Sequence, residues 1–327
     1  MKIGALGDVV MASPLLLAIK RKYPLASITW IVGSIAEPLL RASTLVEELL
    51  VVDEEKLFKG SIFQKLVILT SLWCRLAFRR FDLCLIAHSD PRYRVLALPI
   101  RCRERRFWSR KEARPIPGRY HAEEYIRLWT QSDEASLPEI SFPSLSLPSL
   151  QTLKHAYQDL PWVVVAPGGA KNPLADDSLR RWPIGFYVEL LKQLSTLPIH
   201  LFVTGAFHDL WVRPYLKDVS CIDLIGELDV LGLLSLLQES KLLVTHDSGP
   251  LHLAKMVRCP VIALFGPTQP EEKVGIQEDV HVLWKGREFS CSPCYDGKCY
   301  APCQRNRCLE AISPQEVFEK ALLLLSE

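Results

Sequence analysis

Short apolar runs alternate with longer amphipathic segments along most of the chain. In the second half, segments of helical period separate five such runs, each with glycine, proline or a polar residue at its end: WVVVAPGG, IHLFVTG, CIDLIG, KLLVTHDSG and VIALFGPT. This alternation is typical of a parallel sheet built from βα units. The pattern predicts a Rossmann-like α/β domain.

The first half repeats the pattern more loosely. Strands are expected in SITWIVG, LLVVD and FDLCLIAHS, and helices in SPLLLAIKRKY and FQKLVILTSLWCRL. A stretch rich in Ser and Pro, residues 141–161, lacks any period and fits a linker. We therefore expect two domains, residues 1–155 and 156–327, with a final helix that Ser313 caps and Pro314 opens.

Composition places the chain among compact globular proteins. Of its 327 residues, 49% are hydrophobic and 23% are charged, and the net charge of +2 gives no overall attraction to nucleic acid. Pro14 and the basic residues from Lys20 to Lys22 interrupt the first apolar run, so we expect no signal peptide and a cytoplasmic protein. The longest apolar run, residues 66–78, is too short to span a bilayer and is expected to form a core helix.

Ligands of open parallel sheets bind beyond the carboxyl ends of the strands. Of the turns that follow strands here, T-H-D-S-G-P is the most informative, because Asp247, Ser248 and Gly249 open a helix. Backbone N–H groups and the helix dipole at that point suit a phosphate or diphosphate, although Asp247 acting only as a helix cap would also explain the pattern. No G-x-G-x-x-G follows a strand and no G-K-[ST] occurs, which argues against an NAD enzyme and a P-loop ATPase.

Five motifs occur together in the order of one known family. They are GALGDVVMASPLLLAIKRKYP, HAEEYIRLW, VVVAPGG, the RRWP turn and VTHDSGPLHLAKMVRCPVIALFGPTQP. This set resembles glycosyltransferase family 9, the ADP-heptose heptosyltransferases of lipopolysaccharide assembly, over nearly the whole chain. The resemblance implies a GT-B fold, in which two Rossmann-like domains have parallel sheets that face a central cleft. It also implies an inverting transfer of heptose from ADP-heptose to a glycolipid of the lipopolysaccharide core.

The resemblance assigns two catalytic roles. Asp8, in the L-G-D turn, would take the proton of the acceptor hydroxyl, whereas the residues alone would equally make it a helix cap. Only residues 1–3 precede Gly4, so the strand that should hold Asp8 is shorter than usual, as if the sequence began inside it. Arg180 stands where the family has a lysine and would stabilise the departing diphosphate. Without the resemblance, Arg180 and Arg181 would equally suit a solvated helix start.

The implied donor site lies at the strand ends of the second half. Backbone amides would hold the diphosphate, Asp247 would bind the sugar, and glycines would let the backbone approach the phosphates. The residues in question are Gly168, Gly169, Ala170, Gly205, Asp247, Ser248, Gly249, Leu251 and His252. His252 would contact phosphate or only pack against the turn, and His208 is a weaker candidate near the nucleoside.

A basic stretch in the first half is the candidate acceptor surface. Residues 101–115 hold seven basic and two acidic residues together with Phe107 and Trp108. Basic residues interleaved with aromatic ones suit a phosphorylated glycolipid or the anionic inner leaflet, so a peripheral membrane contact is expected. Most charge runs are only solvated surfaces, and nucleic acid is not expected as a partner, because the rest of the chain carries no basic excess.

Five of the ten cysteines fall within residues 291–308. Four thiolates close together make a site for structural zinc or iron, and a branch of the resembled family carries cysteine-bound iron. The preferred ligands are Cys291, Cys294, Cys303 and Cys308, and the fifth thiol is Cys299. The alternative is a loop of reduced cysteines without metal, and no cofactor is expected for the chemistry.

Three other functions are compatible with the same fold. A protein could replace the glycolipid as acceptor, which no motif decides. A UDP-sugar epimerase of GT-B type is disfavoured by L-G-D and by D-S-G-P-x-H-L-A. A non-catalytic scaffold stabilised by metal is disfavoured by the joint presence of Asp8, Arg180 and Asp247.

Overall fold

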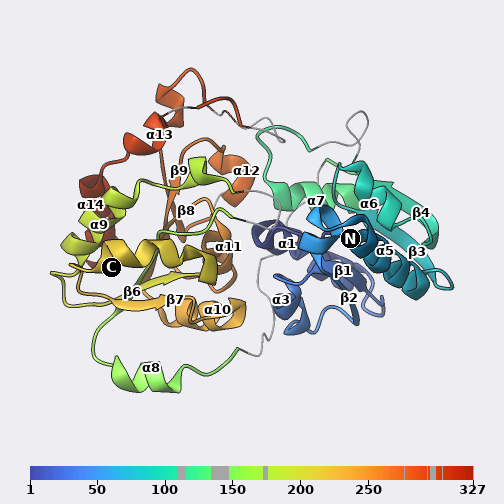
Figure 1. Ribbon diagram of the computed structural model, residues 1–327, viewed down its shortest axis with the longest axis horizontal. Helices are drawn as coiled ribbons and strands as arrows, with labels where there is room; N and C mark the ends of the chain where they lie inside the picture. The colour runs from blue at the N-terminus through green and yellow to red at the C-terminus, as the bar shows by residue number, and fades with distance from the viewer. Residues whose placement is uncertain are drawn as a thin grey trace. The chain divides into compact units, whose positions relative to one another are not determined.

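The computed structural model describes residues 1–108, 115–133, 147–171, 176–275, 277–292, 294, 300–303 and 305–326. Residues 109–114 of the basic stretch, residues 134–146, of which 141–146 begin the expected linker, and Cys299 lie outside them. The described residues form two compact units, one of residues 1–133 and one that begins at Leu147 (Figure 1). The second unit begins before the expected boundary because helix α8 (Gln151–Ala156) belongs to it, where Lys154 pairs with Glu239 at 2.8 Å.

The first unit is an α/β unit with parallel strand pairs. Strand β1 (Thr29–Gly33) pairs with β2 (Glu48–Val52), and β3 (Arg80–Ile86) pairs with β4 (Arg101–Phe107). The helices are α1 (Leu6–Ala12), α2 (Pro14–Lys22), α3 (Glu37–Arg41), α4 (Glu54–Lys59), α5 (Ile62–Leu76), α6 (Pro91–Leu96) and α7 (His121–Thr130). The strands and helices expected in this half are therefore present, and β4 is an addition.

The short opening segment connects the two strand pairs. The carbonyl of Ile3 accepts a hydrogen bond from Gly33 N, at the end of β1, at 2.8 Å. The carbonyl of Met1 accepts one from Ala87 N, just after β3, at 3.1 Å. Ile3 is fully buried. Three residues are thus enough to place the start of α1 between β1 and β3.

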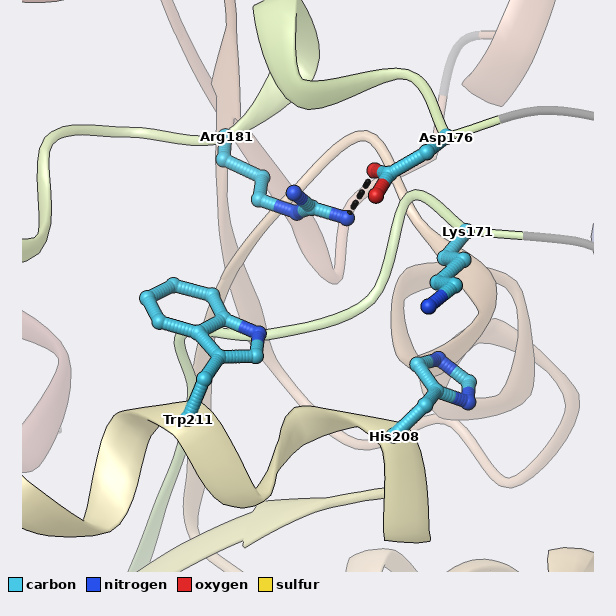
Figure 2. A pocket seen from close by; sticks show the side chains of 5 residues that line it. All are labelled: Lys171, Asp176, Arg181, His208 and Trp211. Carbon is cyan, nitrogen blue, oxygen red and sulfur yellow. Dashed lines mark hydrogen bonds and ion pairs between the residues drawn. The ribbon is translucent and has the colours of Figure 1, made fainter.

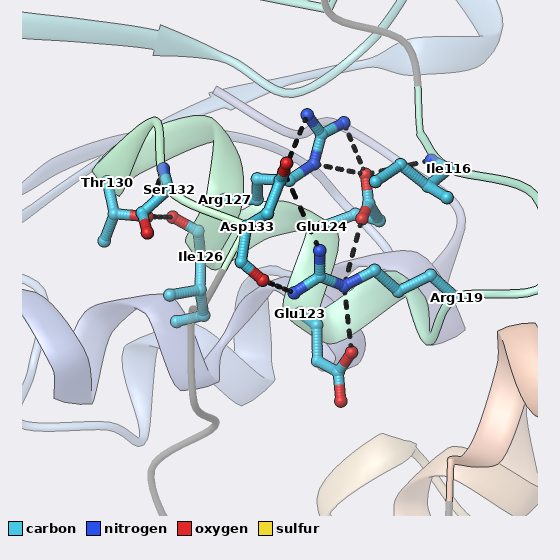
Figure 3. Close-up of polar contacts among 9 residues, drawn as sticks. All are labelled: Ile116, Arg119, Glu123, Glu124, Ile126, Arg127, Thr130, Ser132 and Asp133. Atoms are coloured by element: carbon cyan, nitrogen blue, oxygen red, sulfur yellow. Dashed lines mark hydrogen bonds and ion pairs between the residues drawn. The ribbon is translucent and has the colours of Figure 1, made fainter.

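The segment before α7 is fastened to that helix by a buried carboxylate. Glu124 is fully buried and accepts hydrogen bonds from Arg127 Nε at 2.9 Å, Arg127 Nη2 at 2.7 Å and Ile116 N at 3.1 Å (Figure 3). Arg119 Nε lies 3.4 Å from the other carboxylate oxygen. Glu124 belongs to the HAEEYIRLW motif, and its contacts make it a structural residue of the first unit.

Helix α5 differs from the expected core helix. Leu72 and Leu76 are buried, but Leu66 is 52% exposed, Val67 is 49% exposed and Phe78, just beyond the helix, is 90% exposed. The apolar residues of the run point to more than one side of the helix, and only one side packs on the unit's core. The expected helix is therefore present, but only one of its sides belongs to the core.

The second unit is built on one six-stranded parallel sheet of order β10-β9-β8-β5-β6-β7. Its strands are β5 (Trp162–Ala166), β6 (His200–Gly205), β7 (Ile222–Ile225), β8 (Leu242–His246), β9 (Val261–Phe265) and β10 (Val280–Trp284). The five expected runs form β5 to β9, and β10 extends the sheet beyond them.

Helical segments connect and flank these strands. They are η1 (Ser178–Arg180), α9 (Ile184–Leu194), η2 (Phe207–Leu216), α10 (Val230–Glu239), α11 (Gly249–Met256), α12 (Pro270–Val274), η3 (Gly286–Glu288), α13 (Arg307–Glu310) and α14 (Pro314–Ser326). The segment η2 is a 3₁₀ helix, and Pro214 inside it has no N–H to donate. Helix α14 begins as expected, because Ser313 Oγ accepts a hydrogen bond from Glu316 N at 3.1 Å.

The strand order of the second unit defines where a ligand should bind. From β5 the chain moves to β6 and β7 on one side, and then returns to place β8 on the other side of β5. Helices α9 and α14 pack together on one face of the sheet, where alternate residues of β5 such as Val163 and Val165 meet them. The topological switch point therefore lies between β5 and β8, where α/β sheets bind ligands.

Candidate functional site

Two loops meet at this switch point. After β5 the backbone is left-handed at Gly169, with φ of +86°, and at Ala170, with φ of +51°. A Cβ atom on Gly169 would lie 3.3 Å from the Cβ of Ser248, which follows β8. Predicted residues from two separate motifs are thus neighbours, and glycine is needed at 169 both for its conformation and for the close approach.

A third loop is joined to the first by Asp209. This carboxylate is 2% exposed and accepts hydrogen bonds from Gly169 N at 2.8 Å and from Ala206 N at 2.9 Å. A Cβ atom on Gly168 would lie 2.6 Å from Asp209 Oδ1, so the carboxylate occupies the space that glycine leaves open. Sequence reasoning missed Asp209, although its place in the turn after β6 was a usable signal. Gly205, which was selected, begins that turn.

Asp247 is buried among groups that stabilise its charge. It is 2% exposed, and its Oδ2 accepts a hydrogen bond from Thr268 Oγ1 at 2.8 Å and lies 3.4 Å from Arg180 Nη1. Burial favours the neutral carboxyl, but Arg180, Lys273 and His252 outweigh it, so the pKa of Asp247 is lowered. Asp247 is therefore an ionised, fixed carboxylate at the end of β8.

Arg180 is held between two carboxylates. Its Nη2 lies 2.9 Å from Asp177 Oδ2, and its Nη1 faces Asp247. Burial alone would lower the pKa of Arg180, but the charges of Asp247, Tyr300 and Asp177 raise it, so the guanidinium stays protonated. The alternative of a solvated helix start does not describe these contacts, because the Arg180 side chain is only 19% exposed.

The helix that follows β8 begins without a side-chain cap. Ser248 precedes α11, and its hydroxyl bonds the carbonyl of His246 at 3.2 Å and lies 3.3 Å from Thr245 Oγ1, rather than bonding a helix amide. The position before the helix belongs to Ser248, so Asp247 does not cap α11. Gly249, Leu251 and His252 lie in the first turns of α11, where Leu251 and His252 are buried.

A buried histidine supports this strand end. His246, the last residue of β8, is fully buried, and its Nδ1 lies 3.0 Å from the hydroxyl of Tyr187 in α9. Burial and the neighbouring Arg180 lower the pKa of His246 to about 3, so the imidazole is neutral at physiological pH. The Tyr187 contact anchors β8 to helix α9. His246 lies in a motif of the sequence, but Tyr187 does not, so the contact was not predicted.

A pocket of about 290 Å³ opens beside the first and third loops (Figure 2). It is lined by Lys171, Asp176, Arg181, His208 and Trp211. Arg181 Nε donates to the carbonyl of Gly169 at 2.8 Å, and its guanidinium lies 5.7 Å from the Trp211 ring centroid. The pocket joins two cationic side chains, an imidazole and an indole ring with one carboxylate, Asp176, which is paired with Arg181. Lys171 leaves a net positive charge beside the indole ring, so the pocket suits an anionic ligand that carries a flat aromatic group.

In the first unit, Asp8 lies in the first turn of α1. The position before the helix is occupied by Ala5, so Asp8 is not the helix cap. Its Oδ2 lies 2.9 Å from Lys2 Nζ, and the two side chains are 34% and 5% exposed. The carboxylate is thus reachable from solvent, while its cationic partner is buried beneath it.

Other titratable side chains gather around the same strand ends. His88, after β3, stacks on Tyr93 with ring centroids 4.1 Å apart, and burial followed by the charge of Lys2 lowers its pKa to about 4. Glu54 begins α4 and is 5% exposed, and a Cβ atom on Gly33 would lie 2.8 Å from its carboxyl. Burial and then Asp53 raise the pKa of Glu54 to about 7, which Lys2 opposes.

The described part of the basic stretch is a strand followed by a buried tryptophan, and not an exposed lipid-binding segment. Residues 101–107 form β4, where Arg106 pairs with Glu104 at 2.6 Å and Arg94 lies 4.0 Å over the ring of Phe107. Trp108 is buried and stacks on Tyr125, with ring centroids 4.9 Å apart. Of the two described aromatic side chains of this stretch, Trp108 is therefore inside the unit, and Phe107 is partly buried with Arg94 over its ring.

The four preferred cysteines lie in a common electrostatic environment. Burial raises the pKa of the Cys294 thiol, followed by Cys303 and Cys291, and burial followed by Cys294 raises that of Cys308 to about 11. Within the described ranges, however, no three Cys, His, Asp or Glu side chains are grouped closely enough to hold a metal ion. The metal site thus stays a prediction.

Among the helices of the described residues, none combines the length and the apolar content needed to cross a membrane.

Comparison with known proteins identifies a family and several curated relatives. A family model described as glycosyltransferase family 9 (heptosyltransferase) matches residues 101–304. The chain is 24% identical over 334 aligned positions to lipooligosaccharide heptosyltransferase 2 of Campylobacter jejuni, covering 96% of this chain and 95% of that protein. Matches to four other curated heptosyltransferases span only 25% to 48% of those proteins.

Solved structures share the fold. A glycosyltransferase family 9 protein from Veillonella parvula superposes with a TM-score of 0.78 at 20% identity, covering 99% of this chain and 95% of that one. The heptosyltransferase WaaC of Escherichia coli, solved with ADP, has a TM-score of 0.70 at 16% identity, with coverage of 99% and 100%. The expected α/β fold of GT-B type is confirmed.

Proposed function

The chain belongs to glycosyltransferase family 9, and from that membership we propose that it transfers a heptose from ADP-heptose to a glycolipid of the lipopolysaccharide core, with inversion at the anomeric carbon. The family establishes a glycosyltransferase of heptosyltransferase type. The donor, the acceptor and the stereochemistry are part of the proposal. They draw on the relative from C. jejuni and on the neighbour that was solved with ADP.

The observation that carries the proposal is the arrangement at the switch point of the second unit. There the glycine turn after β5 adjoins Ser248, and a buried carboxylate, Asp247, is paired with Arg180. A sugar nucleotide needs close backbone approach to its diphosphate, a cation to balance it and an acceptor for its sugar hydroxyls. These groups are the ones present, and the motifs of the dinucleotide and P-loop folds are not.

In this mechanism Asp8 is the general base. It accepts the proton of the acceptor hydroxyl as that oxygen attacks the anomeric carbon from the side opposite the diphosphate, and a single displacement of this kind inverts the configuration. The Lys2 ammonium, 2.9 Å away, favours the ionised form of the carboxylate, which is the form that accepts a proton.

The second unit stabilises the departing ADP. Arg180 supplies a guanidinium with fork geometry for phosphate oxygens, and the uncapped start of α11 supplies backbone N–H groups at Ser248, Gly249 and Leu251. Pro250 has no N–H to contribute. Asp247 is fixed in place to accept hydrogen bonds from the sugar.

The pocket beside these loops is proposed to hold the nucleoside part of the donor. Trp211 offers an aromatic face, and Lys171 and His208 offer polar contacts at its opening. Its lining comes from the turns after β5 and β6, next to the proposed diphosphate site.

The cysteines of residues 291–308 are proposed to hold a structural zinc or iron ion through Cys291, Cys294, Cys303 and Cys308. The support is the donor set, together with the raised pKa values of Cys294 and Cys308, to which burial contributes most and neighbouring thiols contribute next. Such an ion would fasten the loop and take no part in sugar transfer. Metal analysis of purified protein tests this, because Cys294→Ser and Cys308→Ser should each remove the ion.

We further propose that the protein works in the cytoplasm, at the inner face of the inner membrane. A glycolipid acceptor is anchored there, and transfer to it requires at least a peripheral contact. Nucleic acid is not proposed as a partner, since the net charge is only +2.

The deciding experiment is a transfer assay with purified protein, ADP-heptose and lipopolysaccharide core acceptors that lack heptose. The proposal requires product from wild type and a loss of about 100-fold or more in kcat for Asp8→Asn, because general bases contribute about 10²- to 10⁴-fold. ADP should still bind that variant with its wild-type Kd. Activity with a peptide acceptor instead would favour the protein-glycosylating alternative, and no transfer from any heptose donor would refute the proposal.

A further inference from the structure

Helix α5 has two apolar faces, and only one of them packs against other described residues. At 3.6 residues per turn, Ile68, Leu69, Leu72 and Leu76 fall on the side that packs against the unit's core. The opposite side carries four large apolar residues, with exposed fractions of 79% for Ile62, 75% for Phe63, 52% for Leu66 and 49% for Val67.

This outward face is continuous along the first half of the helix. Ile62, Phe63, Leu66 and Val67 follow the i, i+1, i+4, i+5 spacing that keeps side chains on one side. The helix start is well fixed by a capping box, in which Ser61 Oγ accepts from Gln64 N at 3.3 Å and Gln64 Oε1 accepts from Ser61 N at 2.8 Å. The exposed residues therefore belong to a formed helix turn and not to a fraying end.

The charges around the face are of one sign. Residues 56–81 contain six Lys and Arg residues and no Asp or Glu. Lys59, the last residue of α4, and Arg75, in the last turn of α5, are both exposed. The neighbouring acidic residues Glu48 and Asp82 are paired with Arg79 and Arg103.

Strand register extends this basic area. Arg80, at the start of β3, pairs in register with Arg101, at the start of β4, and both side chains are exposed. The described part of the expected acceptor stretch thus contributes charge next to α5, while Trp108 is buried and Phe107 is partly buried. In Figure 1, α5 lies alongside β3 and α6 within the first unit.

We propose that the outward face of α5, defined by Ile62, Phe63, Leu66 and Val67, binds the surface of an anionic phospholipid bilayer. Apolar side chains on one side of a helix, surrounded by Lys and Arg and with no unpaired acidic group in the same segment, are what such a surface binds. The apolar residues enter the headgroup region, and Lys59 and Arg75 meet the lipid phosphates. The inference rests on the proposed function in one respect, that a glycolipid acceptor lies in a membrane.

The charge pattern favours lipid over a second copy of the chain. Two copies meeting through this face would bring together two sets of six basic residues, of which only Lys56 and Arg79 are paired with a carboxylate in the structure, and this costs energy. An anionic bilayer instead offers apolar depth and compensating charge at the same place.

Vesicle co-sedimentation of the full chain tests the proposal, with neither donor nor acceptor present. Wild type should bind vesicles of phosphatidylglycerol and phosphatidylcholine more strongly than vesicles of phosphatidylcholine alone. The double variant Phe63→Ser, Leu66→Ser should lower the vesicle–water partition coefficient by about tenfold or more. The reason is that two large apolar side chains, whose transfer from water into the bilayer favours binding, are missing. Lys59→Gln with Arg75→Gln should weaken binding to the anionic vesicles and reduce its salt dependence.

The matched control removes exposed apolar groups from the second unit. Phe207 and Leu323 are 78% and 52% exposed, so Phe207→Ser with Leu323→Ser changes a similar apolar area and should leave vesicle binding at the wild-type level. Far-ultraviolet circular dichroism and thermal melting confirm that each variant is folded.

Three results would overturn the proposal. The first is that wild type does not bind anionic vesicles, and the second is that the Phe63→Ser, Leu66→Ser variant binds them as strongly as wild type. The third is that this variant loses self-association in sedimentation equilibrium while its vesicle binding is unchanged. The last would assign the face to a second copy. Transfer to a deacylated, water-soluble acceptor is measured separately, so failure of the proposed enzyme activity is distinguishable from failure of membrane binding.

Discussion

Replacing Asp209 with alanine should loosen two turns of the candidate site at once. In the structure this buried carboxylate accepts hydrogen bonds from Gly169 N at 2.8 Å and Ala206 N at 2.9 Å. A hydrogen bond to a charged acceptor contributes about 1.5–3 kcal/mol, so the two contribute about 3–6 kcal/mol. Alanine also removes the cost of burying the charge, so we expect the lower end, about 3 kcal/mol.

The expected effects are both global and local. A loss of about 3 kcal/mol corresponds to a fall in Tm of roughly 6–12 °C for a unit of this size. Hydrogen exchange should quicken in peptides that contain residues 166–170 and 205–209, and ADP should bind more weakly in calorimetric titration, because the turn proposed to approach its phosphates is no longer held.

Asp229→Ala is the matched control. Asp229 caps α10 and accepts a single hydrogen bond, from Gly232 N at 2.7 Å, away from the candidate site. An ordinary cap is worth about 1 kcal/mol, so Tm should fall by only about 2–4 °C and ADP affinity should not change. If Asp209→Ala melts like this control and keeps wild-type exchange in both turns, Asp209 does not fasten the site.

Three further changes probe the first unit. Glu124→Gln should cost about 1.5–3 kcal/mol in chemical denaturation, because Arg119 and Arg127 lose their buried carboxylate partner and keep only the more exposed Glu123 and Asp133; a cost below about 1 kcal/mol would contradict this. The pKa of Glu54 is raised to about 7, so its contribution to stability falls as pH rises from about 4.5 through 7, and Glu54→Gln should gain stability relative to wild type above pH 7 but not below pH 4.5. Lys2→Met should lower kcat and move its acid limb to higher pH, since Asp8 loses a cation 2.9 Å away, and Lys2→Arg should restore both. An unchanged pH profile in Lys2→Met would leave Lys2 a packing residue only.

The sequence was most informative about buried strands. Runs such as WVVVA and LLVTH are largely apolar and buried at every position, because both faces of a parallel sheet are covered, and they form the central strands β5 and β8. Strand β4, with the sequence RCRERRF, could not be recognised in this way. Its residues are mostly exposed, and it forms through backbone pairing with β3 rather than through burial.

Periodicity also could not decide which side of α5 is buried. A helix with apolar residues on two sides fits a core helix and a surface helix equally, and the choice depends on what the rest of the chain packs against it. The structure leaves Phe63 and Leu66 in solvent, which only the folded unit could reveal.

For the candidate site, the motifs located the turns but not the contacts that hold them. Gly168, Gly169 and Ser248 were predictable, because the carboxyl ends of neighbouring parallel strands share one edge of the sheet. Asp209 and Thr268 were not, although both lie in turns that the pattern had marked. Their role depends on which atoms of other turns they reach, and that distance is a tertiary property.

The contacts of Arg180 also indicate how a diphosphate would enter this site. Its guanidinium contacts Asp177 at 2.9 Å and Asp247 at 3.4 Å, and the two carboxylates differ in burial, with 22% and 2% of the side chain exposed. Asp247 keeps a hydrogen bond from Thr268 and a favourable interaction with Lys273 without further change. Asp177 can be hydrated when it is released, whereas release of the buried Asp247 would leave its charge less compensated. In the proposed mechanism, a phosphate oxygen therefore replaces Asp177 as the partner of Arg180, and the Arg180–Asp247 pair stays intact. Asp247 can then accept hydrogen bonds from the sugar while Arg180 binds the departing diphosphate.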